Sequence, residues 1–166
     1  MPDTEFDPAP LLETLVRHEV DFVLIGGLAA AALGSSRSTY DIDIAYGRTT
    51  ENLERLTSAL IELGATLRGA PAGVPFLLDA KTLASGLNFT FSTRFGALDI
   101  LGEPAGAPRY EDLKSAALTT LIRGFSVRVA SLDHMIAMKE AAGRPHDKQT
   151  AAELRAISDE LRGRSE

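Results

Sequence analysis

The stretch 22–44, with the sequence FVLIGGLAAAALGSSRSTYDIDI, constrains the fold of this chain more than any other. A short apolar run ends at Gly26 and Gly27, an Ala-rich segment follows, and the stretch closes on two aspartates, one on each side of an isoleucine. Side chains at positions i and i+2 of a strand lie on the same face, so Asp41 and Asp43 are predicted to lie side by side. The pattern predicts a buried strand, a short helix and a second strand that carries both carboxylates.

This arrangement favours chemistry on phosphates. Two carboxylates on one rigid face offer the oxygen ligands that a hard divalent cation such as magnesium prefers. A helix that opens at Gly27 has backbone N–H groups at its start that can hold a phosphate. A phosphate cradle that faces a metal-binding carboxylate pair is what phosphoryl or nucleotidyl transfer requires.

A family resemblance rests on the same residues. Gly26-Gly27, a short helix, Arg37 and then Asp41-Ile42-Asp43 resemble the signature of the nucleotidyltransferase superfamily, which has the fold of DNA polymerase beta. Within it, the chain is most similar to small bacterial members related to AbiEii and MenT-type toxins. The resemblance implies that Gly26 and Gly27 bind the triphosphate of an NTP. It also implies that the two aspartates, with a third carboxylate from a later strand, hold two magnesium ions. Many members have serine at the position of Gly27, whereas others have Gly-Gly.

Asp99 is the candidate for the third carboxylate, because it stands among apolar residues in a predicted strand, Leu98-Asp99-Ile100. Burial of a lone carboxylate is costly unless it is paired or bound to a cation. A hydrogen-bonded structural role is the alternative, and the placement near the aspartate pair favours a metal ligand.

An Asp-x-Asp pair by itself is a weak signal, since strand ends often carry solvated aspartates. Phosphatases of the haloacid-dehalogenase type need the first aspartate directly after an apolar strand, but Ser38, Thr39 and Tyr40 precede Asp41. Glycosyltransferases place the pair after a nucleotide-binding domain longer than the 40 residues that stand before Asp41. The glycine pair, Arg37 and the later aspartate together favour the nucleotidyltransferase fold.

Three residues near the end of the chain are further candidates. Lys139, Arg144 and Asp147 resemble a KxxxxRxxD segment that follows the catalytic sheet in AbiEii-like members. Gly143 and Pro145 are predicted to hold Arg144 on a rigid corner, from which Lys139 and Arg144 would reach the triphosphate while Asp147 orients one of them. For Lys139 the alternative is a favourable interaction with the dipole at the end of its helix. Arg37 either contacts phosphate or braces the turn before Asp41.

Composition limits the class of protein. A chain of 166 residues is long enough for one domain with a proper core, and its net charge of −6 argues against a broad nucleic-acid groove. It has no cysteine, and its longest apolar run is far shorter than the roughly 20 residues that span a bilayer. We therefore expect a cytoplasmic protein with no membrane partner.

The predicted architecture is a single α+β domain over 1–166, with a small mixed sheet flanked by helices. Residues 1–7 are predicted to be a flexible leader, and 131–166 to form C-terminal helices. The predicted helices are 10–18, 28–33, one that Thr49 or Thr50 caps and Gly64 ends, 110–117, 132–142, and a last one from Pro145 with Leu154, Ile157 and Leu161 inward. The predicted strands are 22–25, 40–45, a short one within 65–72, then 75–78, 87–92, 97–101, 121–122 and 125–129.

These observations predict a magnesium-dependent enzyme that moves a nucleoside monophosphate from an NTP to an acceptor. The acceptor remains open between tRNA, a protein and a small molecule. The resemblance also implies a possible toxin of a toxin–antitoxin pair, with an antitoxin as partner protein. The alternative is a nucleotide-binding or partner-binding module with little turnover, although such a module has no reason to keep three buried carboxylates.

Overall fold

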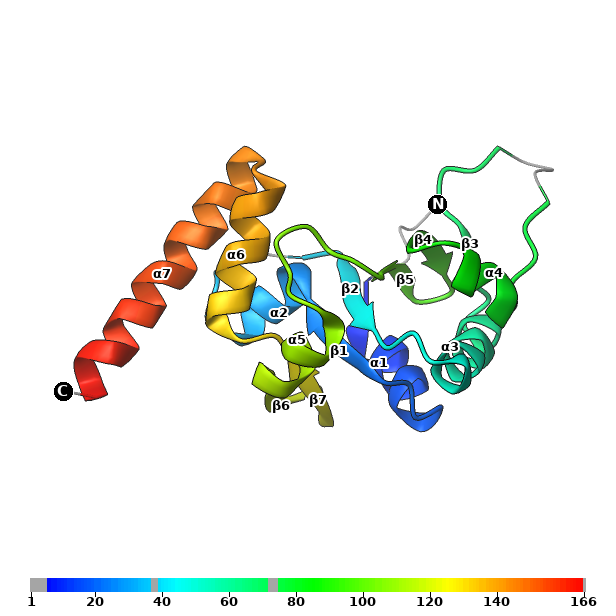
Figure 1. Ribbon diagram of the computed structural model, residues 1–166, viewed down its shortest axis with the longest axis horizontal. Coiled ribbons are helices and arrows are strands. Elements are labelled where there is room, and N and C mark those ends of the chain that lie inside the picture. The colour runs from blue at the N-terminus through cyan, green and yellow to red at the C-terminus, as the bar shows by residue number, and fades with distance from the viewer. Residues whose placement is uncertain (1–5, 37–38, 72–74, 166) are drawn as a thin grey trace.

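A mixed β-sheet organises the molecule and brings distant parts of the sequence together (Figure 1). The computed structural model describes residues 6–36, 39–71 and 75–165. Over these ranges the sheet has seven strands in the order β3-β4-β5-β2-β1-β7-β6. The strands are β1 (Phe22–Ile25), β2 (Asp41–Tyr46), β3 (Thr66–Leu67), β4 (Asn88–Thr93), β5 (Gly96–Leu101), β6 (Leu118–Ile122) and β7 (Phe125–Val129).

Helices pack around this sheet, so the α+β architecture predicted from the sequence is confirmed. The helices are α1 (Pro8–Arg17), α2 (Gly26–Ala32), α3 (Thr50–Glu62), α4 (Ala80–Ser85), α5 (Tyr110–Ala116), α6 (Leu132–Ala142) and α7 (Pro145–Ser165). Helices α6 and α7 form an antiparallel pair, and α7 continues past the sheet to the C-terminus (Figure 1). Helix α2 lies between β1 and β2 in the chain and contacts both strands as well as α6.

The centre of the sheet fixes the positions of the aspartates. Strand β2 pairs antiparallel with β1 and parallel with β5, and in this register Asp43 is the partner of Ile25 on one side and of Asp99 on the other. Ile42 and Ile44 point to the opposite face, where both are fully buried in the hydrophobic core. The alternation of a strand therefore places the carboxylates on one face and the core on the other, as the sequence predicts.

The sequence signals for helix ends are confirmed at α3 and α6. Thr49 accepts a hydrogen bond from the backbone N–H of Asn52, and Ser131 accepts one from His134, so each hydroxyl caps its helix. Gly143 ends α6 with a φ of 69°, a left-handed conformation that favours glycine. The turn that follows leads directly into Pro145, the first residue of α7.

Two sequence predictions are wrong. Residues 75–78 form no strand. The edge of β4 that they would need is already paired with β3. Phe76 packs its ring against Phe89 and Phe91. The short helix α4 that follows was not predicted. Leu161 does not point inward: it is 49% exposed, because this part of α7 runs past the sheet, whereas Leu154 is fully buried.

Of the predicted leader, residues 1–5 lie outside the described residues, whereas Asp7 caps α1 by accepting a hydrogen bond from Ala9. Phe6 packs against the hydrophobic core. Within the ranges described above, no helix combines the length and the apolar character needed to cross a membrane.

Candidate active site

Three carboxylates gather at the centre of the sheet. Asp41 and Asp43 come from β2 and Asp99 from β5, and each is partly buried. One carboxylate oxygen from each residue lies within 4.8 Å of the others. The parallel pairing of β2 with β5 makes this possible, since it sets Asp43 and Asp99 side by side on neighbouring strands. We call these three residues the acidic triad.

Two glycines give the acidic triad its space. Gly26 has a φ of 75°, and a Cβ atom at this position would overlap the carboxylate of Asp43. At Gly27 a Cβ atom would lie 2.7 Å from the hydroxyl oxygen of Thr39. Any larger residue at Gly26 would combine backbone strain with displacement of Asp43. The two glycines singled out by the sequence thus allow the start of α2 to lie directly against the residues around the triad.

Charge repulsion shapes the electrostatics of the acidic triad. Burial, the negative charges of Asp41 and Asp99, and a hydrogen bond with Asp99 raise the pKa of Asp43 to about 7, although the positive charge of Lys139 acts in the other direction. Like charges at such short range disfavour full ionisation unless a cation joins them. The donor set also suits a divalent ion: carboxylate oxygens are the ligands that hard cations prefer. The residues present therefore fit a divalent metal site.

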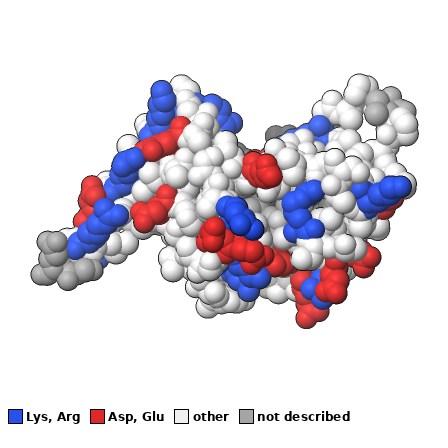
Figure 2. Space-filling view, viewed as in Figure 1, with Lys and Arg blue, Asp and Glu red and all other residues white. Residues whose placement is uncertain are grey.

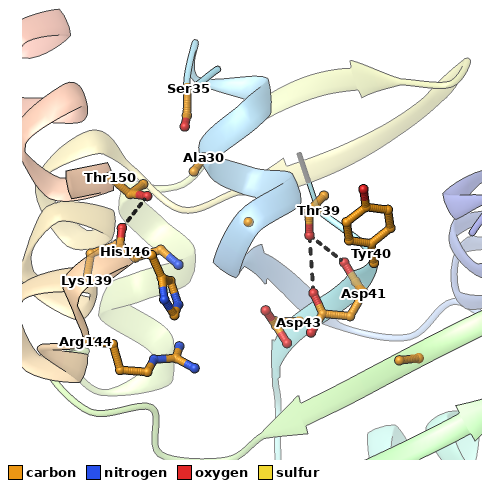
Figure 3. A pocket seen from close by; sticks show the side chains of 12 residues that line it. Ala30, Ser35, Thr39, Tyr40, Asp41, Asp43, Lys139, Arg144, His146 and Thr150 are labelled. Atoms are coloured by element: carbon orange, nitrogen blue, oxygen red, sulfur yellow. Dashed lines mark hydrogen bonds between the residues drawn. The ribbon is translucent and has the colours of Figure 1, made fainter. Parts of the chain in front are cut away.

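Basic side chains at the α6–α7 corner face Asp41 and Asp43 (Figure 3). Lys139 on α6, Arg144 in the corner and His146 on α7 line the same cavity as Asp41 and Asp43. The side chain of Lys139 is only 15% exposed, with its Nζ atom 3.6 Å from Oδ1 of Asp147. Lys139 therefore points toward the site and not into solvent.

Asp147 forms ion pairs with the basic residues Lys139 and Arg144. It is fully buried, and Arg144 donates to its Oδ2 from Nε at 2.6 Å and from the backbone N–H at 3.3 Å. Burial opposes ionisation of Asp147, but the hydrogen bond from Arg144 and the charges of Arg144, Lys139 and His146 hold its pKa below the usual range. The aspartate thus fixes two cations at a rigid corner between two helices.

Two cavities meet at the acidic triad. The first measures about 430 Å³ and the second about 320 Å³, and both are lined by Asp41, Asp43, Lys139 and Arg144. Only the first is also lined by Gly27, Ala30, Ser35, Thr39, Tyr40, Ala97, His146 and Thr150. Only the second is also lined by Ile25, Gly26, Asn88, Asp99, Leu101, Glu103, Pro104, Ala105, Met135, Met138, Ala142 and Asp147. Asp99 therefore belongs to the second cavity, whereas Gly27 belongs to the first.

Several site residues were not predicted. Thr39 donates a hydrogen bond to Oδ1 of Asp41 at 3.2 Å, and its position two residues before Asp41 was the available signal (Figure 3). Thr150 lines the first cavity and donates to the backbone carbonyl of His146 at 2.9 Å, which stabilises the first turns of α7. His146 stands between Arg144 and Asp147 in a segment the sequence did single out. Arg37, predicted to bind the nucleotide, lies outside the described residues.

On the face shown in Figure 2, acidic and basic side chains are interspersed and do not form a continuous basic surface. Lys and Arg side chains along α7 alternate there with Asp and Glu.

Comparisons with known proteins identify the family of the chain and its fold. A family model described as "Nucleotidyl transferase AbiEii toxin, Type IV TA system" matches residues 11–151. A search of curated protein sequences found no significant match.

Among solved structures, the lincosamide antibiotic adenylyltransferase LnuA aligns with a TM-score of 0.62 at 14% identity, covering 90% of this chain and 94% of that one. The antibiotic-resistance factor ANT(2'')-Ia aligns with a TM-score of 0.55 at 18% identity, covering 95% of this chain and 90% of that one. At these identities the structural similarity shows a shared fold.

Proposed function

The chain belongs to the AbiEii family of nucleotidyltransferases, and from this premise we propose that it transfers a nucleoside monophosphate from an NTP to an acceptor hydroxyl at the acidic triad. The observation that carries the proposal is the position of the triad where two cavities meet, with Lys139 and Arg144 lining both. A nucleotidyl transfer has two substrates that must meet at one phosphorus atom, and this arrangement provides a place for each.

The acidic triad would hold the divalent metal ions, and two magnesium ions are our proposal for their identity and number. Ions bound there would polarise the α-phosphate and lower the pKa of the acceptor hydroxyl. The space that Gly26 leaves beside Asp43 and the repulsion among the three carboxylates support this assignment.

We assign the NTP to the first cavity. Lys139 and Arg144 supply positive charge for the triphosphate, and Gly27 at the start of α2 lines the same cavity. Asp147 acts indirectly, since it holds both cations in place and is itself fully buried. His146, which lines the same cavity, adds a further hydrogen-bonding group. Fixed cations beside the leaving group stabilise the negative charge that develops on pyrophosphate.

We assign the acceptor to the second cavity, because Asp99 lines it and does not line the first. In the reaction, the acceptor oxygen forms a bond to the α-phosphorus while the bond to the pyrophosphate oxygen breaks. During this step the acceptor hydroxyl passes its proton to the carboxylate of Asp99, which also orients that hydroxyl, and pyrophosphate leaves from the first cavity. Binding in adjacent cavities brings both reactants together at the triad, which converts a bimolecular encounter into a positioned one.

The acceptor class follows from the family only as a set of candidates. The family description names a toxin of a type IV toxin–antitoxin system, so cellular RNA or protein is one candidate and an antitoxin is a candidate partner. The adenylyltransferase named for lincosamide antibiotics has the same fold, so a small hydroxylated molecule is another.

The test is a transfer assay. The purified chain is incubated with magnesium and each of the four NTPs, with bulk tRNA, a total protein extract, an aminoglycoside, a lincosamide or no acceptor. Pyrophosphate release and the mass of the acceptor are measured, and we expect one acceptor to gain one nucleoside monophosphate. The Asp43→Asn variant should release no pyrophosphate and transfer no nucleoside monophosphate. If the wild-type chain neither binds an NTP with magnesium nor releases pyrophosphate with any acceptor, the proposal is wrong.

A further inference from the structure

Arg68 makes a contact with the acidic triad that neither the sequence pattern nor the proposed reaction includes. It follows β3 directly, and its Nη2 atom donates to Oδ1 of Asp99 at 2.7 Å. Asp99 is 16% exposed and Arg68 is 38% exposed, so the ion pair is partly shielded from solvent. Within the described ranges, Arg68 forms the one ion pair to a member of the triad.

The sheet fixes the position of Arg68. Its backbone N–H donates to the carbonyl of Thr90 at 2.9 Å, and its Nη1 atom donates to the carbonyl of Phe91 at 3.1 Å. Thr90 is in turn the register partner of Asp99 across β4 and β5. The side chain of Arg68 thus extends from the end of β3 across β4 to the carboxylate of Asp99 on β5.

The two ends of the guanidinium serve different acceptors. Nη1 is held by a backbone carbonyl, and Nη2 holds one oxygen of the carboxylate. A planar guanidinium with both ends engaged fixes the rotation of its partner, which an ammonium group at a single point does not do. Carboxylates that bind metals are commonly oriented by such hydrogen bonds from neighbouring side chains.

We propose that Arg68 is a positioning residue that holds Asp99 in the orientation in which its carboxylate completes the acidic triad. The inference rests on the proposed metal site. Arg68 binds Oδ1 of Asp99 from the β3 side, while Asp41 and Asp43 lie within reach of the carboxylate from β2. Its positive charge also offsets part of the repulsion within the triad when no cation is bound.

A purely structural role for Arg68 is the competing explanation, because the same hydrogen bonds fasten the short strand β3 to the sheet. The two explanations differ in what they predict for metal binding. Loss of a structural contact lowers stability with or without metal. Loss of positioning raises the metal concentration needed to stabilise the protein.

The experiment measures the melting temperature during titration with magnesium alone, and again with manganese, with no nucleotide present. Arg68→Lys keeps the charge but cannot bridge the two acceptors, and Arg68→Gln removes the charge as well. We expect both variants to shift the midpoint of the metal titration upward by about 10-fold or more, the usual scale for a partner that orients a metal ligand. Arg94→Gln is the matched control. Arg94 lies in the turn between β4 and β5 and donates to the backbone carbonyl of Glu62, away from the triad.

The control should lower the melting temperature and leave the metal midpoint unchanged. The proposal is overturned if Arg68→Lys titrates like the wild-type chain, because then the two-point attachment is unnecessary. It is also overturned if Arg68→Gln binds the metal more tightly, because then the charge only competes with the ion. A wild-type chain whose melting temperature never responds to metal would instead refute the proposed metal site itself.

Discussion

The backbone of Gly26 lies directly against the carboxylate of Asp43, so that a Cβ atom on the glycine would overlap the aspartate. Gly26 also has a φ of 75°, where a side chain is strained. A methyl group at this position therefore acts on the acidic triad and on the backbone at once. The two effects can be separated, because other glycines of the chain share the conformation without the overlap.

The first prediction is that Gly26→Ala lowers stability and abolishes stabilisation by magnesium. The left-handed backbone should cost about 1–2 kcal/mol, and displacement of Asp43 should remove the metal response. Gly124→Ala is the matched control, since Gly124 has a φ of 88° and no atom within 4 Å of the added Cβ. Melting curves with and without magnesium measure both effects. Equal loss of stability with an intact magnesium response in both variants would contradict the prediction.

The second prediction concerns pH. The pKa of Asp43 is raised to about 7, above the 3.8 expected for the unfolded chain. Between these values the folded state binds a proton that the unfolded state does not bind, so stability falls as pH rises and levels off above pH 7. The slope is at most about 1.4 kcal/mol per pH unit. Without metal, the wild-type chain should therefore lose stability from pH 5 to pH 8.

Asp43→Asn should remove this component of the pH dependence, whereas Asp133→Asn, at an exposed position on α6, should keep it. Denaturant unfolding at a series of pH values gives the comparison. Saturating magnesium should also reduce the loss of wild-type stability between pH 5 and pH 7, because the cation replaces the proton in relieving repulsion. A wild-type profile identical to that of Asp43→Asn would show that the group does not titrate in this range.

The sequence alone predicted the arrangement around β2, because local rules decide it. Alternation in the strand places Asp41 and Asp43 together, and glycines mark the break between β1 and α2. Asp99, predicted to lie near this pair, is the register partner of Asp43 on the neighbouring strand. These predictions succeed because each depends on neighbours in the chain or on a motif that includes them.

The contribution of Arg68 could not be predicted, because it depends on the register of three strands. Leu67 pairs with Phe91, and Thr90 pairs with Asp99, and only both registers together bring the guanidinium to the carboxylate. Residues 75–78 show the opposite failure. Their apolar side chains predicted a strand. In the structure Phe76 packs against the rings of Phe89 and Phe91, and residues 75–78 form no strand.

The third prediction is that Asp99→Asn loses turnover while its affinity for the NTP stays nearly unchanged. Asp99 lines the cavity that we assign to the acceptor and not the one that we assign to the nucleotide. An interaction that matters mainly in the transition state lowers kcat without a matching change in substrate binding. Calorimetry with NTP and magnesium, combined with pyrophosphate release, separates the two. Equal losses of affinity and rate would place Asp99 in the nucleotide site.

The last prediction concerns Lys139 and its partner Asp147 at the α6–α7 corner. Lys139→Ala should weaken NTP binding by about 1–3 kcal/mol, the scale of a charged hydrogen bond. Lys139 is 15% exposed and lines both cavities, so its charge is poorly screened by solvent. Lys114→Ala is the matched control, because Lys114 also pairs with an aspartate, at 3.1 Å from Asp21, and lines neither cavity. Titration calorimetry with NTP measures the difference, and equal affinity in both variants would remove Lys139 from the nucleotide site.

Asp147→Asn should weaken NTP binding as well, although Asp147 lies behind both cations. The change leaves Arg144 and Lys139 without the carboxylate that fixes them, so their side chains gain freedom that nucleotide binding must then remove. It should also lower stability by about 1–3 kcal/mol, since a fully buried acceptor loses its charge-assisted hydrogen bonds. In the double variant with Lys139→Ala, the loss of NTP affinity should be smaller than the sum of the single losses, because part of the effect of Asp147→Asn passes through Lys139. Strictly additive losses would mean that Asp147 supports the nucleotide site only through Arg144.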